Sequence, residues 1–154
     1  MIRVSKETDY GVILLARFAS GGQLVKQSAR QLAAETKLSL PMVSKVLKIL
    51  ARQGLLTSHR GVKGGYSLAR PANAISVVEI IQAVEGPIAM MECIESPGEC
   101  CHEPLCQLQS NWRTINDAVK QALSGIKLSD MIEPLTDRSI VFSELESASP
   151  KRSF

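Results

Sequence analysis

The chain has 154 residues, 45% hydrophobic and 21% charged, which suits one domain with at most a small accessory part. No run of 18 or more apolar residues occurs, and this excludes a transmembrane helix. The first residues also lack the apolar region of a signal peptide, so we expect a cytoplasmic protein whose thiols stay reduced.

The net charge of +3 conceals an uneven distribution along the chain. Residues 26–70 hold nine Lys or Arg and a single acid, Glu35, a balance of +8. The rest of the chain holds nine basic and fourteen acidic residues, a balance of −5. This asymmetry predicts one part that binds a polyanion and another part with a different task.

A helix is predicted over residues 5–19. Ser5, or Thr8 as the second choice, caps its start, because a hydroxyl can accept from the free N–H groups of the first turn. Ser20-Gly21-Gly22 ends it. Its apolar face combines Tyr10, Ile13, Leu14, Arg17 and Phe18 at helical spacing with Val12 and Leu15.

Two further helices follow, a short one over 28–36 and a longer one capped by Ser39 that ends near Gln53. Ser28 and Gln31 form a capping-box pattern at the start of the short helix. Two helices joined by a tight turn, the second rich in lysine, indicate a helix-turn-helix. The longer helix is expected to bury one stripe made of Val43, Val46, Leu47 and Leu50.

A hairpin is predicted directly after the helix-turn-helix. Leu55 to His59 and Tyr66 to Ala69 read as strands, and the glycine-rich stretch 60–65 reads as the turn between them. The order helix–helix–helix–hairpin is the winged-helix plan, so the expected fold class is mainly α, with a winged helix-turn-helix. His59, on the first strand, is expected to be structural.

The second half is predicted to contain a helix over 76–85 with a capping box, a cysteine loop, and a long helix from Gln107 to about Ser124. The apolar stripe of the long helix favours a dimer interface over packing within one chain; its residues are Leu108, Trp112, Ile115, Val119, Ala122 and Leu123. A short helix or turn over 127–132 and a disordered tail complete the chain. We expect four parts: a DNA-binding domain over 1–86, a loop over 87–106, a dimerisation segment over 107–133 and the tail over 134–154.

The basic segment predicts a DNA-reading surface on the longer helix and the hairpin. The N-terminal residues of a recognition helix meet base edges in the major groove, and lysines contact phosphates. A single lysine on a helix is more often only solvated, but nine cations on a winged-helix layout favour DNA binding. The expected contact residues are Ser28, Arg30, Ser44, Lys45, Lys48, Arg60, Lys63 and Gly64.

Four cysteines lie within fourteen residues, namely Cys93, Cys100, Cys101 and Cys106, and the rest of the chain has none. The stretch carries glycine and prolines and reads as an irregular loop outside any core. No pair has the CxxC spacing of zinc sites, and the wide spacing suits a larger iron–sulfur cluster. Adjacent cysteines cannot easily bind one iron, so three ligands and one spare thiol are expected. Zinc, or a disulfide switch, stays an alternative.

An enzymatic function is not expected. The sequence has no nucleotide-binding glycine motif, no acid–base constellation and no CxxC redox pair. A small iron–sulfur oxidoreductase is therefore the weakest alternative, behind a constitutive repressor with zinc in the loop.

Several segments together resemble the winged-helix iron–sulfur regulators of the IscR type, and among them the regulators of the SUF assembly system. They are VSKETDYGV, ARQLAAETKLSLPMVSKVLKILARQGLL, RGVKGGYSLAR, ISVVEIIQAVEGP and the spaced cysteines before the helix of Trp112. The resemblance covers residues 1 to about 133. It implies a homodimer, a palindromic operator, and DNA binding governed by an iron–sulfur cluster, with cluster assembly genes as targets.

The resemblance also implies a ligand set. Cys93, Cys100 and Cys106 match the three cysteine ligands of the family. In the nitric-oxide-sensing relatives the fourth ligand is an aspartate on the first helix of the other subunit, which is the place of Asp9. Asp9 is equally readable as an ordinary acid at a helix start. The alternative fourth ligands are Cys101, His102 and Gln109, where Gln109 takes the place of a family histidine.

The departure from the family pattern at Gln109 leaves the cluster type open between [2Fe-2S] and [4Fe-4S]. The signal is open as well, among cluster supply, iron, redox state and nitric oxide.

Overall fold

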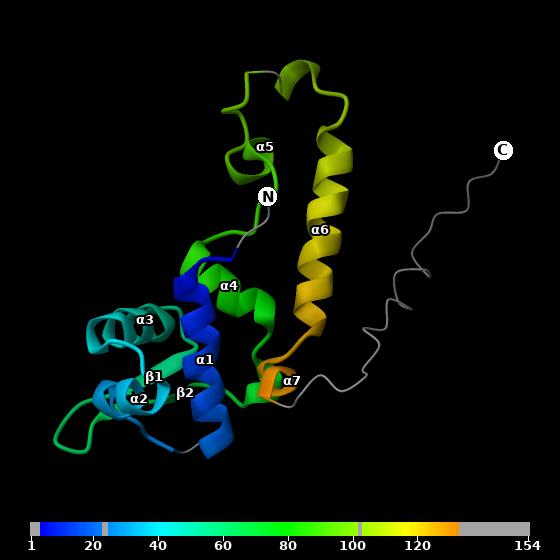
Figure 1. Cartoon of the computed structure of the whole chain (residues 1–154). Coiled ribbons are helices and arrows are strands. Elements are labelled where there is room, and N and C mark those ends of the chain that lie inside the picture. Colours follow the sequence, from blue (N-terminus) through cyan, green and yellow to red (C-terminus); the bar gives the residue numbers. More distant parts are fainter. Residues whose placement is uncertain (1–3, 23–24, 102, 133–154) are drawn as a thin grey trace.

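The computed structural model describes residues 4–22, 25–101 and 103–132, which are mainly helical with one two-stranded antiparallel hairpin. Figure 1 shows α2, α3 and the hairpin at one end of the molecule, and α6 running alongside with α5 near one of its ends and α7 near the other. The predicted winged helix-turn-helix is confirmed. The elements are α1 (Lys6–Gly21), α2 (Ala29–Thr36), α3 (Leu40–Arg52), β1 (Leu56–His59), β2 (Gly65–Leu68), α4 (Val77–Glu85), α5 (Glu92–Glu95), α6 (Gln109–Gly125) and α7 (Leu128–Ile132), with the 3-10 turns η1 (Ala72–Ala74) and η2 (Glu103–Leu105).

Side-chain hydrogen bonds set the starts of the first two helices. The Ser5 hydroxyl accepts from the Thr8 N–H at 3.3 Å. The predicted capping box of α2 is present, with the Ser28 hydroxyl accepting from the Gln31 N–H at 3.3 Å and the Gln31 side chain accepting from the Ser28 N–H at 2.8 Å. Ser39 has the backbone of a cap residue, but its side chain makes no capping bond, so the start of α3 lacks this stabilisation.

The core lies where α1, α2 and α3 meet the hairpin, α4 and α7. The predicted stripe of α3 is confirmed, because its four residues have no exposed surface. On α1 the burial of Leu14, Leu15 and Phe18 is confirmed, but Ile13 is 37% exposed. Burying one large aliphatic side chain contributes about 1.5–3 kcal/mol. The core residues are Leu14, Leu15, Phe18, Leu32, Val43, Val46, Leu47, Leu50, Leu55, Leu56, Leu68, Ile75, Ile80 and Leu128.

The hairpin pairs β1 with β2 in register from Leu56 opposite Leu68 to His59 opposite Gly65. His59 Nε2 lies 2.8 Å from Ser67 Oγ on the other strand, which agrees with the structural role expected for this histidine. Tyr66 also exchanges two backbone hydrogen bonds with Gln27, of 2.9 and 3.0 Å. The segment before α2 thereby joins the hairpin and fixes the wing against the helix-turn-helix.

A second capping box begins α4. The Ser76 hydroxyl accepts from the Glu79 N–H at 3.4 Å, and the Glu79 carboxylate accepts from the Ser76 N–H at 2.8 Å. Arg70, which follows the wing, pairs with Glu79 at 2.7 Å. Burial alone raises the pKa of Glu79, but the bonds from Ser76 and Arg70 outweigh it and lower this pKa to about 2.

The cysteine segment is more ordered than the irregular loop that its composition predicts. It contains the single turn α5 and the turn η2. The N–H groups of Ile94 and Glu95 both donate to the Met91 carbonyl, at 2.9 and 3.1 Å, so local hydrogen bonds replace an irregular path. Cys93 on α5 is buried, contrary to the expectation that this stretch stays outside any packed region.

The long helix α6 leaves its apolar stripe only partly covered, with Trp112, Val119 and Leu123 half-buried. Leu108, just before it, is 57% exposed and Ile115 is 44% exposed. Its one buried residue is Asn116, whose Oδ1 accepts from the Met90 N–H at 3.1 Å. No described helix is long and apolar enough to span a membrane. The predicted tail, from residue 134, lies outside the described residues.

Candidate nucleic-acid interface and cysteine segment

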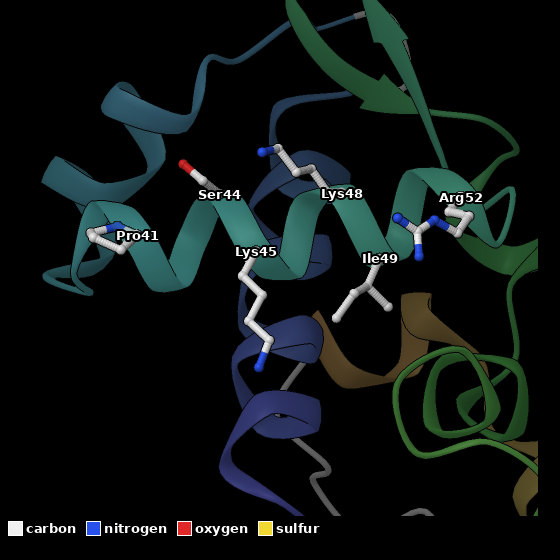
Figure 2. Close-up of a pocket in the computed structure, with 6 residues that line it drawn as sticks. All are labelled: Pro41, Ser44, Lys45, Lys48, Ile49 and Arg52. Carbon is white, nitrogen blue, oxygen red and sulfur yellow. The ribbon is translucent and has the colours of Figure 1, made fainter.

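The outer face of α3 forms a shallow groove of about 620 Å³. The three residues that sequence analysis assigned to DNA on this helix, Ser44, Lys45 and Lys48, all line it. Met42, on the same helix, is half-buried and packs against the core. The lining residues are Pro41, Ser44, Lys45, Lys48, Ile49 and Arg52 (Figure 2).

Lys45 is the cation of this groove that has an internal partner. Its Nζ lies 2.6 Å from Oε1 of Glu7, a residue of the first turn of α1. Lys48 and Arg52 have no carboxylate within 4.0 Å among the described residues. Sequence reasoning missed Glu7, because it and Lys45 are 38 positions apart and no local pattern connects them.

The start of α2 presents Ser28 as a cap and Arg30 as an exposed cation. The hydroxyl and the N–H of Ser28 are both used in the capping box. A phosphate at this helix start would therefore compete with Gln31 for the Ser28 N–H. Arg30 is exposed on the first turn of α2, where its guanidinium is accessible to a polyanion.

The wing exposes two cations and one apolar side chain at its tip. Arg60 and Lys63 are exposed, and Val62 between them has a relative exposure of 107%. Gly64 donates its N–H to the Gly61 carbonyl at 2.9 Å, which closes the turn. A Cβ on Gly64 would lie 2.5 Å from the His59 carbonyl oxygen, so this glycine is required by the turn itself.

All four cysteines are free thiols, and they differ in accessibility. Cys93 is buried, Cys100 is half-buried, and Cys101 and Cys106 are exposed. As donors, three or four thiols on one acidic segment suit an iron–sulfur cluster. Within residues 4–22, 25–101 and 103–132 no group of three or more Cys, His, Asp or Glu is arranged to hold a metal ion. The cysteine thiols are suitable ligands for an iron–sulfur cluster, but the segment would have to rearrange to bring them together.

Glu103 organises the segment in this arrangement. One carboxylate oxygen accepts from the Gly98 N–H at 2.6 Å, and the other accepts from the Gln109 side chain. Gln109, an alternative fourth ligand, therefore has its Nε2 bonded to Glu103, whereas a metal would be bound by its Oε1. His102, another alternative, lies outside the described residues.

Asp9, the first choice for the fourth ligand, is exposed on α1 near a junction with α4. At this junction Oε1 of Glu85 accepts from the Ser5 N–H at 2.9 Å and from the Thr8 hydroxyl. These hydrogen bonds from Ser5 and Thr8 lower the pKa of Glu85. Glu85 is the last residue of α4, so the start of α1 is anchored where the chain turns into the cysteine segment.

Comparisons with known proteins identify related transcriptional regulators. A model of the Rrf2 family, described as an iron-dependent transcriptional regulator, matches residues 4–134. The HTH-type transcriptional regulator CymR of Bacillus subtilis (strain 168) is 30% identical over 130 residues, covering 84% of this chain and 89% of CymR.

Two solved structures show the same fold. That of CymR, described as the global cysteine regulator of B. subtilis, has a TM-score of 0.66 at 28% identity and covers 86% of this chain and 97% of its own. That of IscR from T. potens has a TM-score of 0.61 at 25% identity and covers 99% of this chain and 94% of its own.

Proposed function

Because the chain belongs to the Rrf2 family of iron-dependent transcriptional regulators, we propose that it binds a palindromic operator as a homodimer, under the control of an iron–sulfur cluster held by its cysteine segment. The chain is a transcriptional regulator and not an enzyme, as the sequence predicted. Genes of iron–sulfur cluster assembly are the proposed targets.

The proposed DNA-reading surface combines α3, the start of α2 and the wing. Ser44 and Lys45 would meet bases or nearby phosphates, and Lys48 a phosphate. The exposed Arg60 and Lys63 would reach the minor groove or its phosphates from the wing tip. Arg30 would add a phosphate contact, while Ser28 and Gly64 serve mainly to shape α2 and the wing.

The proposed dimer uses the partly covered stripe of α6. An apolar stripe on a helix that is mostly solvent-exposed in one chain gains stability when a second copy covers it. The exposed residues of this stripe are Leu108, Ile115 and Ala122, and Trp112 and Val119 lie half-buried among them. A two-fold dimer also matches the two half-sites of a palindromic operator.

Cys93, Cys100 and Cys106 would hold the cluster, with Asp9 of the partner subunit as the proposed fourth ligand. When bound, the cluster supplies a bridge among these residues that depends on iron and redox state. Glu103 and Gln109 hold the segment in its present arrangement, so they must release it when the thiolates converge. An ordered cysteine segment would then favour one spacing between the recognition helices of the two subunits.

The observation that carries the proposal is the position of the free thiols between α4, anchored to the start of α1, and the partly covered α6. A first test is anaerobic purification followed by an absorbance spectrum and analysis of iron, sulfide and zinc. We expect a coloured protein with iron and sulfide. A colourless protein with stoichiometric zinc would exclude the cluster.

Variants separate the ligands from the spare thiol. Replacing Cys93, Cys100 and Cys106 by alanine should remove iron and visible absorbance and change operator affinity, whereas Cys101→Ala should keep both. Identical DNA binding by the cluster-loaded and the cluster-free protein would defeat the sensing proposal, even if the cluster is present.

A second candidate function is a metal-free thiol switch. The adjacent Cys100 and Cys101, with Cys101 exposed, favour it, as does the likeness to a global cysteine regulator. In this case the anaerobic protein is colourless and free of zinc, and mild oxidation changes DNA binding reversibly. Cys101→Ala then abolishes the response, in contrast to the outcome expected for a cluster.

A further inference from the structure

Glu7 is an acidic residue at the edge of a basic surface. Its carboxylate lies 2.6 Å from Lys45 Nζ, and the side chains are 35% and 57% exposed. Figure 2 shows the Lys45 side chain directed toward α1, whereas Ser44 and Lys48 project to the other side of α3. The pair therefore holds one cation of the groove away from the direction that its neighbours take.

We propose that Glu7 competes with DNA phosphate for Lys45 and thereby lowers the affinity of this surface for DNA of any sequence. The inference rests on the proposed DNA-binding function of α3. The Lys45 ammonium has three N–H donors, but its 2.6 Å contact with Glu7 directs it toward α1 and partly neutralises its charge, so its attraction to a phosphate is weaker. When the ammonium leaves, the Glu7 carboxylate stays close to a polyanion and repels it.

The competition is confined to Lys45 within the groove. Lys48 and Arg52 carry no carboxylate partner within the described part of the chain, so they can meet phosphates at no such cost. Glu7 thus acts on one contact out of several and reduces affinity without abolishing it. A contact between Lys45 and a phosphate carries no sequence information, so the loss of this contact lowers affinity for non-operator DNA as well as for the operator.

The experiment measures binding of the full chain to a short duplex of mixed sequence over graded salt, for the wild type and Glu7→Gln. We expect Glu7→Gln to bind about 3–10-fold more tightly at the lowest salt. One additional phosphate contact makes the negative slope of log K against log salt steeper by up to about 0.9. The gain should shrink as salt rises, since the added contact is electrostatic.

Glu35→Gln is the matched control, because Glu35 is an exposed acid of the same basic segment that has no lysine or arginine partner within 4.0 Å among the described residues. It changes the net charge equally and should give a distinctly smaller gain. In a Lys45→Gln background the gain from Glu7→Gln should fall to about that of Glu35→Gln, because only general charge repulsion is then relieved. Equal gains for Glu7→Gln and Glu35→Gln, or a gain for Glu7→Gln that is undiminished without Lys45, would overturn the proposed competition.

A purely structural ion pair gives a different result. In that case Glu7→Gln lowers the melting temperature and leaves DNA affinity unchanged or weaker, which contradicts the proposal. Absence of duplex binding by the wild type at low salt would instead overturn the proposed function itself, and this inference with it.

Discussion

Gly65 lets the wing pack directly against the backbone that precedes α2. Its φ of +147° is a conformation that side-chain-bearing residues rarely adopt, and a Cβ there would lie 2.6 Å from the Gln27 carbonyl oxygen. The two hydrogen bonds between Gln27 and Tyr66 depend on this approach. The position of the wing tip, which carries Arg60 and Lys63, therefore depends partly on the absence of a side chain at Gly65.

Gly65→Ala is predicted to destabilise the protein more than Gly61→Ala. Gly61 also has a positive φ, of +103°, but a Cβ there meets nothing within 4 Å. We expect about 1–2 kcal/mol from strain alone for Gly61→Ala, and about 1–2 kcal/mol more for Gly65→Ala because backbone must move. Denaturant unfolding of both variants measures the difference. Equal losses would show that the contact with Gln27 is unimportant.

Helix starts illustrate how elements of the helix-turn-helix are stabilised unequally. α2 has only eight residues and starts with a complete capping box, whereas α3 has thirteen and starts without a side-chain cap. A short helix gains relatively more from its cap, because few internal hydrogen bonds offset the cost of nucleation. The longer α3 is held by its buried stripe.

Ser28→Ala is accordingly predicted to cost about 1 kcal/mol of unfolding free energy, the usual effect of losing a serine cap. Ser39→Ala should cost less than about 0.5 kcal/mol, because no capping bond is lost. Thermal and denaturant unfolding at neutral pH compare the pair. A Ser39 variant that is as unstable as the Ser28 variant would mean that α3 depends on its serine in solution.

At the scale of the whole molecule, the winged-helix part and the long helix α6 differ in how much of their apolar surface the chain itself buries. The winged helix closes its core with Leu128 of α7, which is completely buried. The long α6, in contrast, packs mainly against α4 and α5, and its Asn116 accepts a hydrogen bond from Met90. Several of its apolar residues stay exposed. This contrast is why the proposed dimer belongs to α6 and the proposed DNA surface to the other end (Figure 1).

Ile115→Glu is predicted to convert a dimer into a monomer with an unchanged circular dichroism spectrum. Ile115 is already 44% exposed within the chain, so the charge is tolerated there but not in an apolar interface. Loss of two-site binding should weaken operator affinity by about a hundredfold or more. Analytical ultracentrifugation checks the mass. Thr114→Glu, an exposed neighbour on α6, is the control and should remain dimeric.

The amino-acid sequence by itself determined the features that repeat or pair over a few residues. The buried stripe of α3 follows a helical period, and the boxes at Ser28 and Ser76 span three positions. The hairpin is marked by its glycines, and the grouped cysteines predicted the candidate cofactor segment. Such signals are visible in sequence because their physical cause is local backbone geometry.

Only the tertiary structure decided the contacts between residues far apart in the chain. Glu7 meets Lys45, Gln27 joins Tyr66, and Glu85 anchors the start of α1, although each pair is separated by more than 35 positions. It also decided which thiols are buried and that no three of the described ligands converge. Those outcomes depend on how helices pack against one another, and packing sums many weak interactions that no short sequence pattern records.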